Sequence, residues 1–104
     1  MIQGFVRGTT LNLQGHAGSG PYGQDLVCAA VTALVYALAQ RLQQWEQKGA
    51  LEDPAEIQLG SGKAQISAIP KGDYEAQVTE DFCLISGGLK FLETHYPERI
   101  SMER

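Results

Sequence analysis

Apolar residues recur at intervals of three and four along the stretch from residue 25 to residue 48, and this periodicity constrains the fold more than any other feature. An α-helix has about 3.6 residues per turn, so residues at this spacing lie on one face and pack against a core. We therefore expect a long helix that begins after Asp25 and ends at Gly49, with Pro54 shortly beyond. The stripe comprises Val27, Val31, Leu34, Leu38, Leu42 and Trp45.

A second apolar row extends the apolar surface of this helix beyond one face. It comprises Leu26, Ala30, Ala33 and Ala37, so the first half of the helix is apolar on most sides. One sheet can cover only one of these faces. Because contiguous exposed apolar surface usually marks an interface, we expect this half of the helix to help form a homodimer.

Alternating residues on either side of a Gly-Thr-Thr turn predict two short strands, residues 2–7 and residues 11–15. Leu11 and Leu13 define the apolar face of the second strand. If the alternation continues to residue 16, His16 lies on the same polar face as Asn12 and Gln14, opposite Leu11 and Leu13.

The remaining elements follow the same two patterns. Alternation over residues 57–68, around Gly60-Ser61-Gly62, predicts a β-hairpin. A second helix is expected over residues 74–96, ending before Pro97, and residues 99–103 are expected to form a last short strand. The stripe of the second helix comprises Val78, Phe82, Ile85, Leu89, Leu92 and Tyr96.

The order of elements is strand, strand, helix, strand, strand, helix and strand, within a single domain of residues 1–104. This order favours an α+β fold of two layers, in which a mainly antiparallel sheet carries two helices packed on it.

Composition argues against several classes of function. The chain has eight Lys and Arg against twelve Asp and Glu, a net charge of −4, with no basic cluster to follow a phosphate backbone, so we expect no nucleic acid partner. Residues 26–39 form an apolar stretch too short to span a bilayer, and the first fifteen residues lack the apolar core of a signal peptide. The two cysteines form no Cys-x-x-Cys pair, which gives no support for a zinc site or another cofactor. These features predict a cytoplasmic protein with no membrane partner and a free thiol.

One cysteine and one histidine, twelve positions apart, carry the potential for chemistry. A glycine-rich loop joins His16, at the end of a strand, to the helix whose first turn contains Cys28. With Asp25 as N-cap, the helix dipole lowers the pKa of Cys28 by less than about one unit, and the Asp25 carboxylate opposes this effect. A protonated His16 beside the sulfur would lower the pKa far more and could then protonate a leaving amine.

Three other features complete the candidate thiol site. Thr32 lies one helical turn after Cys28, so its hydroxyl could support the sulfur or His16, or bond back to the backbone. Unpaired N–H groups at the helix start, together with those of the glycine-rich loop after His16, are candidates for an oxyanion site. Cys83, without a helix start nearby, is assigned a structural role.

Each of these residues also has a simpler interpretation. A cysteine in an apolar helix is most often a small core residue. Asp25 can be an N-cap and nothing more, and a histidine at a strand end is usually a surface group. Taken alone, the pattern leaves a cysteine enzyme and a structural cysteine about equally supported.

The run Gly15-His16-Ala17-Gly18, followed by Tyr22-Gly23-x-Asp25-x-Val27-Cys28-Ala29-Ala30-Val31-Thr32-Ala33-Leu34, resembles the signature of the ribosomal-processing cysteine protease family, Prp. The resemblance implies a homodimeric protease without cofactor. Its substrate would be a large-subunit ribosomal protein, the twenty-seventh in the usual count, from which a short N-terminal extension is removed before ribosome assembly.

The resemblance also implies roles for individual residues. Cys28 would be the nucleophile and His16 the base, with Asp25, Thr32 and Gly15 supporting the site. The loop after His16 would cover the bound peptide, with Ala17, Gly18, Tyr22 and Gly23 as substrate-binding residues. Thr32 stands where the family usually has serine.

Two other functions stay open at this level. The first is a noncatalytic module that binds a ribosomal partner during ribosome assembly, which would have no need for a reactive Cys28. The second is an enzyme that transfers an acyl group or a thiol with the same two residues. Turnover of a peptide against turnover of a thioester would distinguish the latter from a protease.

Overall fold

The structure is a computed structural model that describes residues 1–18 and 25–103. Two strands, β1 (Ile2–Arg7) and β2 (Thr10–Gln14), precede helix α1 (Leu26–Gln47). A hairpin of β3 (Glu56–Gly60) and β4 (Lys63–Ser67) follows. A 3-10 turn, η1 (Gly72–Tyr74), leads into helix α2 (Glu75–His95) and strand β5 (Ile100–Met102).

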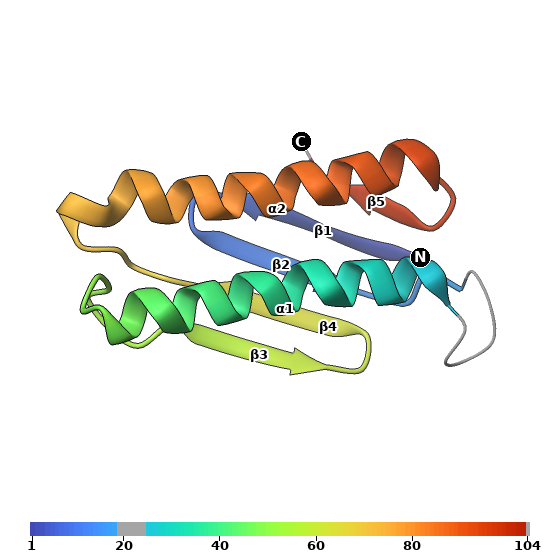
Figure 1. Ribbon diagram of the computed structural model, residues 1–104. Helices are drawn as coiled ribbons and strands as arrows, with labels where there is room; N and C mark the ends of the chain where they lie inside the picture. Colours follow the sequence, from blue (N-terminus) through green and yellow to red (C-terminus); the bar gives the residue numbers. More distant parts are fainter. Residues whose placement is uncertain (19–24, 104) are drawn as a thin grey trace.

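The strands form a five-stranded sheet in the order β3-β4-β2-β1-β5. All neighbouring strands are antiparallel except β1 and β5, which are parallel because the chain crosses over through α2 before β5. Both helices lie on the same face of this sheet and run in opposite directions (Figure 1). The prediction of a two-layer α+β fold with a mainly antiparallel sheet is confirmed.

The core lies between the sheet and the two helices. On α2, four of the six predicted stripe residues are buried, whereas Leu92 is half-buried and Tyr96 is exposed. On α1 the stripe is confirmed at five positions, but Val35 is buried in place of Leu34. Leu34 instead faces α2, where a Cβ on Gly88 would lie 3.1 Å from its Cδ1 atom. The glycine thus allows the two helices to approach closely at this point.

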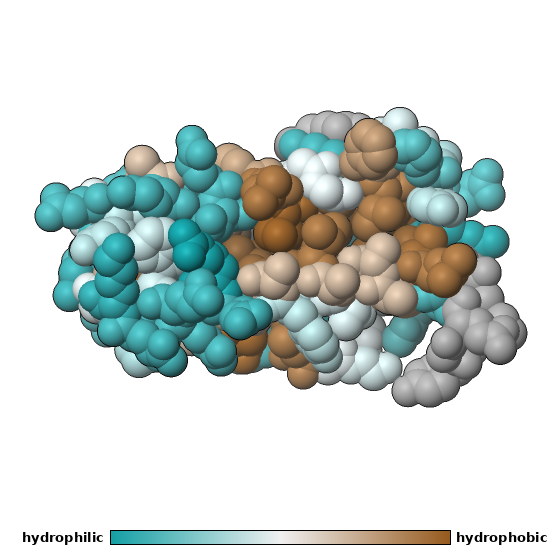
Figure 2. Space-filling model, in the orientation of Figure 1, coloured by the Kyte–Doolittle hydropathy of each residue, from teal (hydrophilic) through white to brown (hydrophobic). Residues whose placement is uncertain are grey.

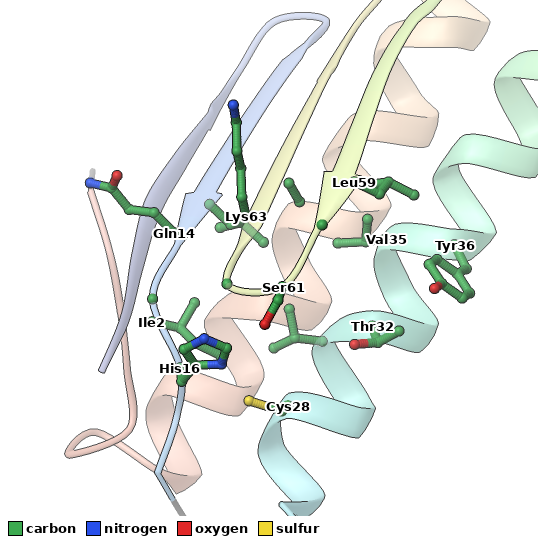
Figure 3. A pocket seen from close by; sticks show the side chains of 16 residues that line it. Ile2, Gln14, His16, Cys28, Thr32, Val35, Tyr36, Leu59, Ser61 and Lys63 are labelled. Atoms are coloured by element: carbon green, nitrogen blue, oxygen red, sulfur yellow. The ribbon is translucent and has the colours of Figure 1, made fainter. Parts of the chain in front are cut away.

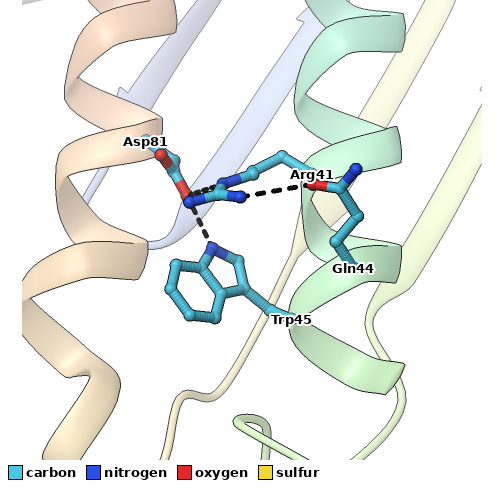
Figure 4. Close-up of polar contacts among 4 residues, drawn as sticks. All are labelled: Arg41, Gln44, Trp45 and Asp81. Carbon is cyan, nitrogen blue, oxygen red and sulfur yellow. Dashed lines mark hydrogen bonds and ion pairs between the residues drawn. The ribbon is translucent and has the colours of Figure 1, made fainter. Parts of the chain in front are cut away.

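A polar contact joins α1 and α2 near the other end of the helix pair (Figure 4). The Trp45 indole N–H donates to Asp81 Oδ2 at 2.7 Å, and Arg41 Nε donates to the same oxygen at 3.2 Å. The Arg41 guanidinium also lies 4.5 Å above the Trp45 ring. These contacts satisfy the polar group of a nearly buried tryptophan and fix the helices relative to each other.

By length and composition alone, α1 is apolar enough to cross a membrane. Six of its residues are nevertheless buried in the core, as expected for the central helix of a globular domain. Its opposite side is exposed and continues onto α2 as an apolar surface, which we call the outer helix face (Figure 2). Its large members are Leu26, Tyr36, Leu84 and Phe91, which are between 60% and 77% exposed.

Candidate active site

The pairing of β2 with β4 brings two distant segments together at one end of the sheet. Gln14, the last residue of β2, is paired with Lys63, the first residue of β4. Beyond this pair, the Gly15 N–H donates to the Gly62 carbonyl at 2.9 Å. The β3–β4 turn therefore lies directly beside the residue that precedes His16.

His16 lies after the end of β2, and its ring points into a pocket (Figure 3). The expectation that it would continue the polar face of β2 is wrong. Gly15 has a φ of +99°, a backbone conformation that ends the strand and changes the direction of the chain. A Cβ at Gly15 would also lie 2.2 Å from the Met1 carbonyl oxygen, so only glycine fits.

Cys28 is held in the first turn of α1 by the predicted helix cap. Asp25 is the N-cap, and its Oδ1 accepts the Cys28 N–H at 2.9 Å. The Sγ atom in turn accepts a hydrogen bond from the Ala17 N–H at 3.3 Å. This bond connects the segment just after His16 directly to the sulfur.

His16 and Cys28 line the same pocket, which has a volume of about 520 Å³ and lies between α1, the end of β2 and the β3–β4 hairpin. In Figure 3 the His16 ring and the Cys28 sulfur face each other from opposite walls at its lower end. Away from them the pocket continues along α1 between mainly apolar side chains. These include Val31, Val35, Tyr36, Leu59 and Ala64.

Burial raises the pKa of the Cys28 thiol above its ordinary value. The hydrogen bond from Ala17 lowers this pKa, whereas the hydrogen bond to Asp25 and its negative charge raise it. No hydrogen bond joins His16 to the sulfur within the described residues, and the expected lowering of the Cys28 pKa by a protonated His16 stays a prediction. Burial thus favours the protonated thiol, from which a base must remove the proton before or during attack.

The other predicted site residues are brought together only in part. Thr32 lines the pocket one turn after Cys28, but among the described residues its hydroxyl has no hydrogen bond to the sulfur or to His16. Gly18 is exposed, and its carbonyl accepts a hydrogen bond from Arg99. Tyr22 and Gly23 lie outside the described residues.

Two of the backbone N–H groups that were candidates for an oxyanion site already donate hydrogen bonds within the protein. The Cys28 N–H donates to Asp25 Oδ1, and the Ala17 N–H donates to the Cys28 sulfur. Within residues 1–18 and 25–103, no group of three His, Cys, Asp or Glu side chains is arranged to hold a metal ion. Cys83 is exposed on α2, outside the pocket.

Sequence reasoning missed one wall of the pocket, the β3–β4 turn with Ser61, Gly62 and Lys63. The Gly-Ser-Gly run was recognised as a turn, but its position beside His16 depends on β4 pairing with β2. That pairing joins residues about fifty positions apart, and no local pattern reports it.

A thiol and an imidazole that face each other across a pocket are the arrangement expected of a cysteine hydrolase. The family described as Cysteine protease Prp matches residues 4–101, nearly the whole chain. This chain therefore belongs to the Prp family and is a cysteine protease. A search of curated proteins gave no significant match.

Solved structures share the fold over almost the full length of the chain. An essential ribosomal processing protease Prp from S. aureus, in complex with a covalently linked product peptide, is 21% identical, with a TM-score of 0.72 over 98% of this chain and 95% of that chain. The same protease with a substrate peptide gives a TM-score of 0.69 at 21% identity, over 99% of this chain and 98% of that chain. SMU.848 from Streptococcus mutans is 26% identical, with a TM-score of 0.67 over 99% of this chain and 92% of that chain.

Proposed function

We propose that this cysteine protease removes a short N-terminal extension from a large-subunit ribosomal protein, the twenty-seventh in the usual count, with Cys28 as nucleophile and His16 as base. The observation that carries the proposal is that His16 and Cys28 face each other across one pocket (Figure 3). Family membership favours this activity over a noncatalytic binding module and over a transferase.

In this proposal His16 acts as a general base, because the thiol must lose its proton to become the nucleophile. His16 takes the thiol proton as Sγ attacks the peptide carbonyl, and a tetrahedral intermediate forms with a new S–C bond. The protonated His16 then gives this proton to the leaving amine as the C–N bond breaks, which leaves a thioester on Cys28. Water, activated by His16, hydrolyses the thioester and restores the thiol.

The shape of the pocket supports a preference for apolar residues next to the scissile bond. From Cys28 the pocket continues along α1 between Val31, Val35 and Leu59, which can desolvate apolar side chains of a bound peptide. The assignment to ribosomal processing rests on the S. aureus protease, which is described as a ribosomal processing protease and was solved with peptides bound.

The protease is further proposed to act as a cytoplasmic homodimer, without nucleic acid or membrane partners. The dimer proposal is supported by the outer helix face, where Leu84 is 74% exposed and Phe91 is 67% exposed. Figure 2 shows that apolar side chains gather over one end of the helix pair, which holds the first half of α1, whereas the other end is hydrophilic. Monomeric proteins rarely leave a patch of this kind uncovered.

Mass spectrometry of the ribosomal protein's N-terminus, before and after incubation with the enzyme, tests the substrate. We expect one cut that removes the extension and leaves the rest of the protein intact. Replacing the apolar residues before the cut by Ala should lower kcat/KM by about tenfold or more, since each loses about 1–3 kcal/mol of pocket binding. An unrelated unfolded protein cut with similar efficiency would show a general peptidase, and binding without any cut would favour the noncatalytic module.

A further inference from the structure

We infer that Gly62 is a positioning residue for His16: the turn between β3 and β4 is the surface on which the imidazole rests, and only glycine leaves room for the ring. The inference rests on the proposed role of His16 as base. It assigns a role to a residue on a different turn of the chain, which does not take part in the reaction itself.

The contact between Gly62 and His16 is very close. A Cβ built on Gly62 would lie 2.7 Å from His16 Nε2 and 3.3 Å from both Cδ2 and Cε1. Real Cβ atoms do not approach other heavy atoms to 2.7 Å, so any side chain at position 62 must displace the ring. Gly62 also has a φ of +70°, which favours glycine.

The backbone around the two residues cannot move apart to relieve this contact. The Gly15 N–H is bonded to the Gly62 carbonyl at 2.9 Å, and Gln14 is paired with Lys63 in the sheet. These bonds hold the residue before His16 against the turn. The imidazole, at the free end of a side chain, is therefore the group that yields.

The direction of this displacement matters for the reaction. The turn and Cys28 lie on different sides of the His16 ring within one pocket (Figure 3). A ring pushed off the turn moves toward Cys28 and changes its orientation, so the separation across which it takes the Cys28 proton is no longer the one that the turn sets. Proton transfer needs a heavy-atom separation of about 2.6–3.2 Å, and a misplacement of about 1 Å can cost about 10²-fold in rate.

Gly62→Ala tests the inference, and Gly8→Ala is its matched control. Gly8 occupies the turn between β1 and β2 with a φ of +55°, and a Cβ there meets nothing within 4 Å. Both variants therefore carry the backbone strain of alanine in a left-handed conformation, but only Gly62→Ala contacts His16. We expect Gly62→Ala to lower kcat by about 10²-fold with KM changed less than about threefold. Gly8→Ala should leave both constants close to those of the parent protein.

A double-mutant cycle with His16→Ala separates this inference from the proposed function. Once the ring is removed, the methyl group at position 62 has room. Gly62→Ala should then lower Tm by no more than Gly8→Ala does, and it should not lower the residual activity further. In the parent background, Gly62→Ala should lower Tm more than Gly8→Ala does.

Either of two results would overturn the inference: a kcat for Gly62→Ala within twofold of Gly8→Ala, or a Tm loss that is unchanged in the His16→Ala background. Full activity of His16→Ala would instead contradict the proposed function. The Tm cycle would still report whether residues 16 and 62 are in contact.

Discussion

Asp25 has two effects on Cys28 that act on different properties. Its Oδ1 accepts the Cys28 N–H and thereby caps α1, which stabilises the helix. Burial raises the pKa of Cys28 most, and the hydrogen bond between Asp25 and the thiol and the Asp25 charge raise it further. The same side chain thus supports the position of the nucleophile and favours its protonated form.

Replacing Asp25 by Asn separates these two effects. Asn is as good an N-cap as Asp, so Tm should change little, whereas loss of the negative charge should lower the pKa of Cys28. A lower pKa means more thiolate at a given pH, so the pH profile of iodoacetamide alkylation should move toward lower pH. The measurement uses a Cys83→Ala background, in which Cys28 is the remaining thiol.

Asp25→Ala is the control for the cap. It removes both the charge and the hydrogen bond, so the alkylation profile should shift as well, but the protein should lose about 0.5–2 kcal/mol of stability. An alkylation profile that stays in place or moves to higher pH in Asp25→Asn would contradict the role given to the charge.

Sequence patterns predicted the position of Cys28 well and that of His16 poorly. An N-cap fixes a residue three positions later through local hydrogen bonds, so Asp25 was enough to place Cys28 in the first turn. The direction of His16 depends on the backbone conformation of Gly15, whose φ of +99° interrupts the alternation of β2. Glycine permits such a conformation but does not require it.

At the level of elements, the helix pair depends on one polar contact at its hydrophilic end. Asp81 Oδ2 accepts hydrogen bonds from both Trp45 and Arg41 (Figure 4). Trp45 is only 7% exposed, so its N–H has little access to water as an alternative partner. The contact therefore aligns α2 with α1, the helix that carries Cys28.

Asp81→Ala should destabilise the protein without changing its chemistry. An unpaired buried N–H costs about 1–3 kcal/mol, and for a domain of this size each kcal/mol lowers Tm by about 4–8 °C. Thermal unfolding followed by circular dichroism measures the change, with Glu80→Ala, an exposed neighbour on α2, as control. Equal Tm values for the two variants would show that the contact does not stabilise the helix pair.

For the whole molecule, element order and class followed from the sequence, but the arrangement of strands did not. Periodicity identified each helix and strand to within about two residues, since it depends on local burial. The order β3-β4-β2-β1-β5 arises from contacts between distant segments, so the pocket wall formed by the β3–β4 turn was missed. Val35 is buried in place of the predicted Leu34 because of where α2 packs against α1, and the periodicity of α1 alone does not predict the position of α2.

The outer helix face gives a prediction for the molecule as an assembly. Sedimentation velocity at micromolar concentration should give the mass of a dimer, and Leu84→Asp should give the mass of a monomer, because a charge buried at an interface is costly. Ile69→Asp is the control, since Ile69 is 61% exposed and belongs to the segment between β4 and η1 rather than to either helix. A monomeric parent protein at this concentration would contradict the proposed dimer.

The central claim is that Cys28 and His16 together cleave a peptide, and kcat/KM for a peptide spanning the cut site tests it most directly. The two cysteines of the chain provide the comparison, because Cys28 lines the pocket and Cys83 is exposed on α2. We predict that Cys28→Ala lowers kcat/KM by about 10³-fold or more and His16→Ala by about 10²–10⁴-fold, while Cys83→Ala stays within twofold of the parent protein. A Cys28→Ala variant that retains a tenth or more of the parent value would contradict the account.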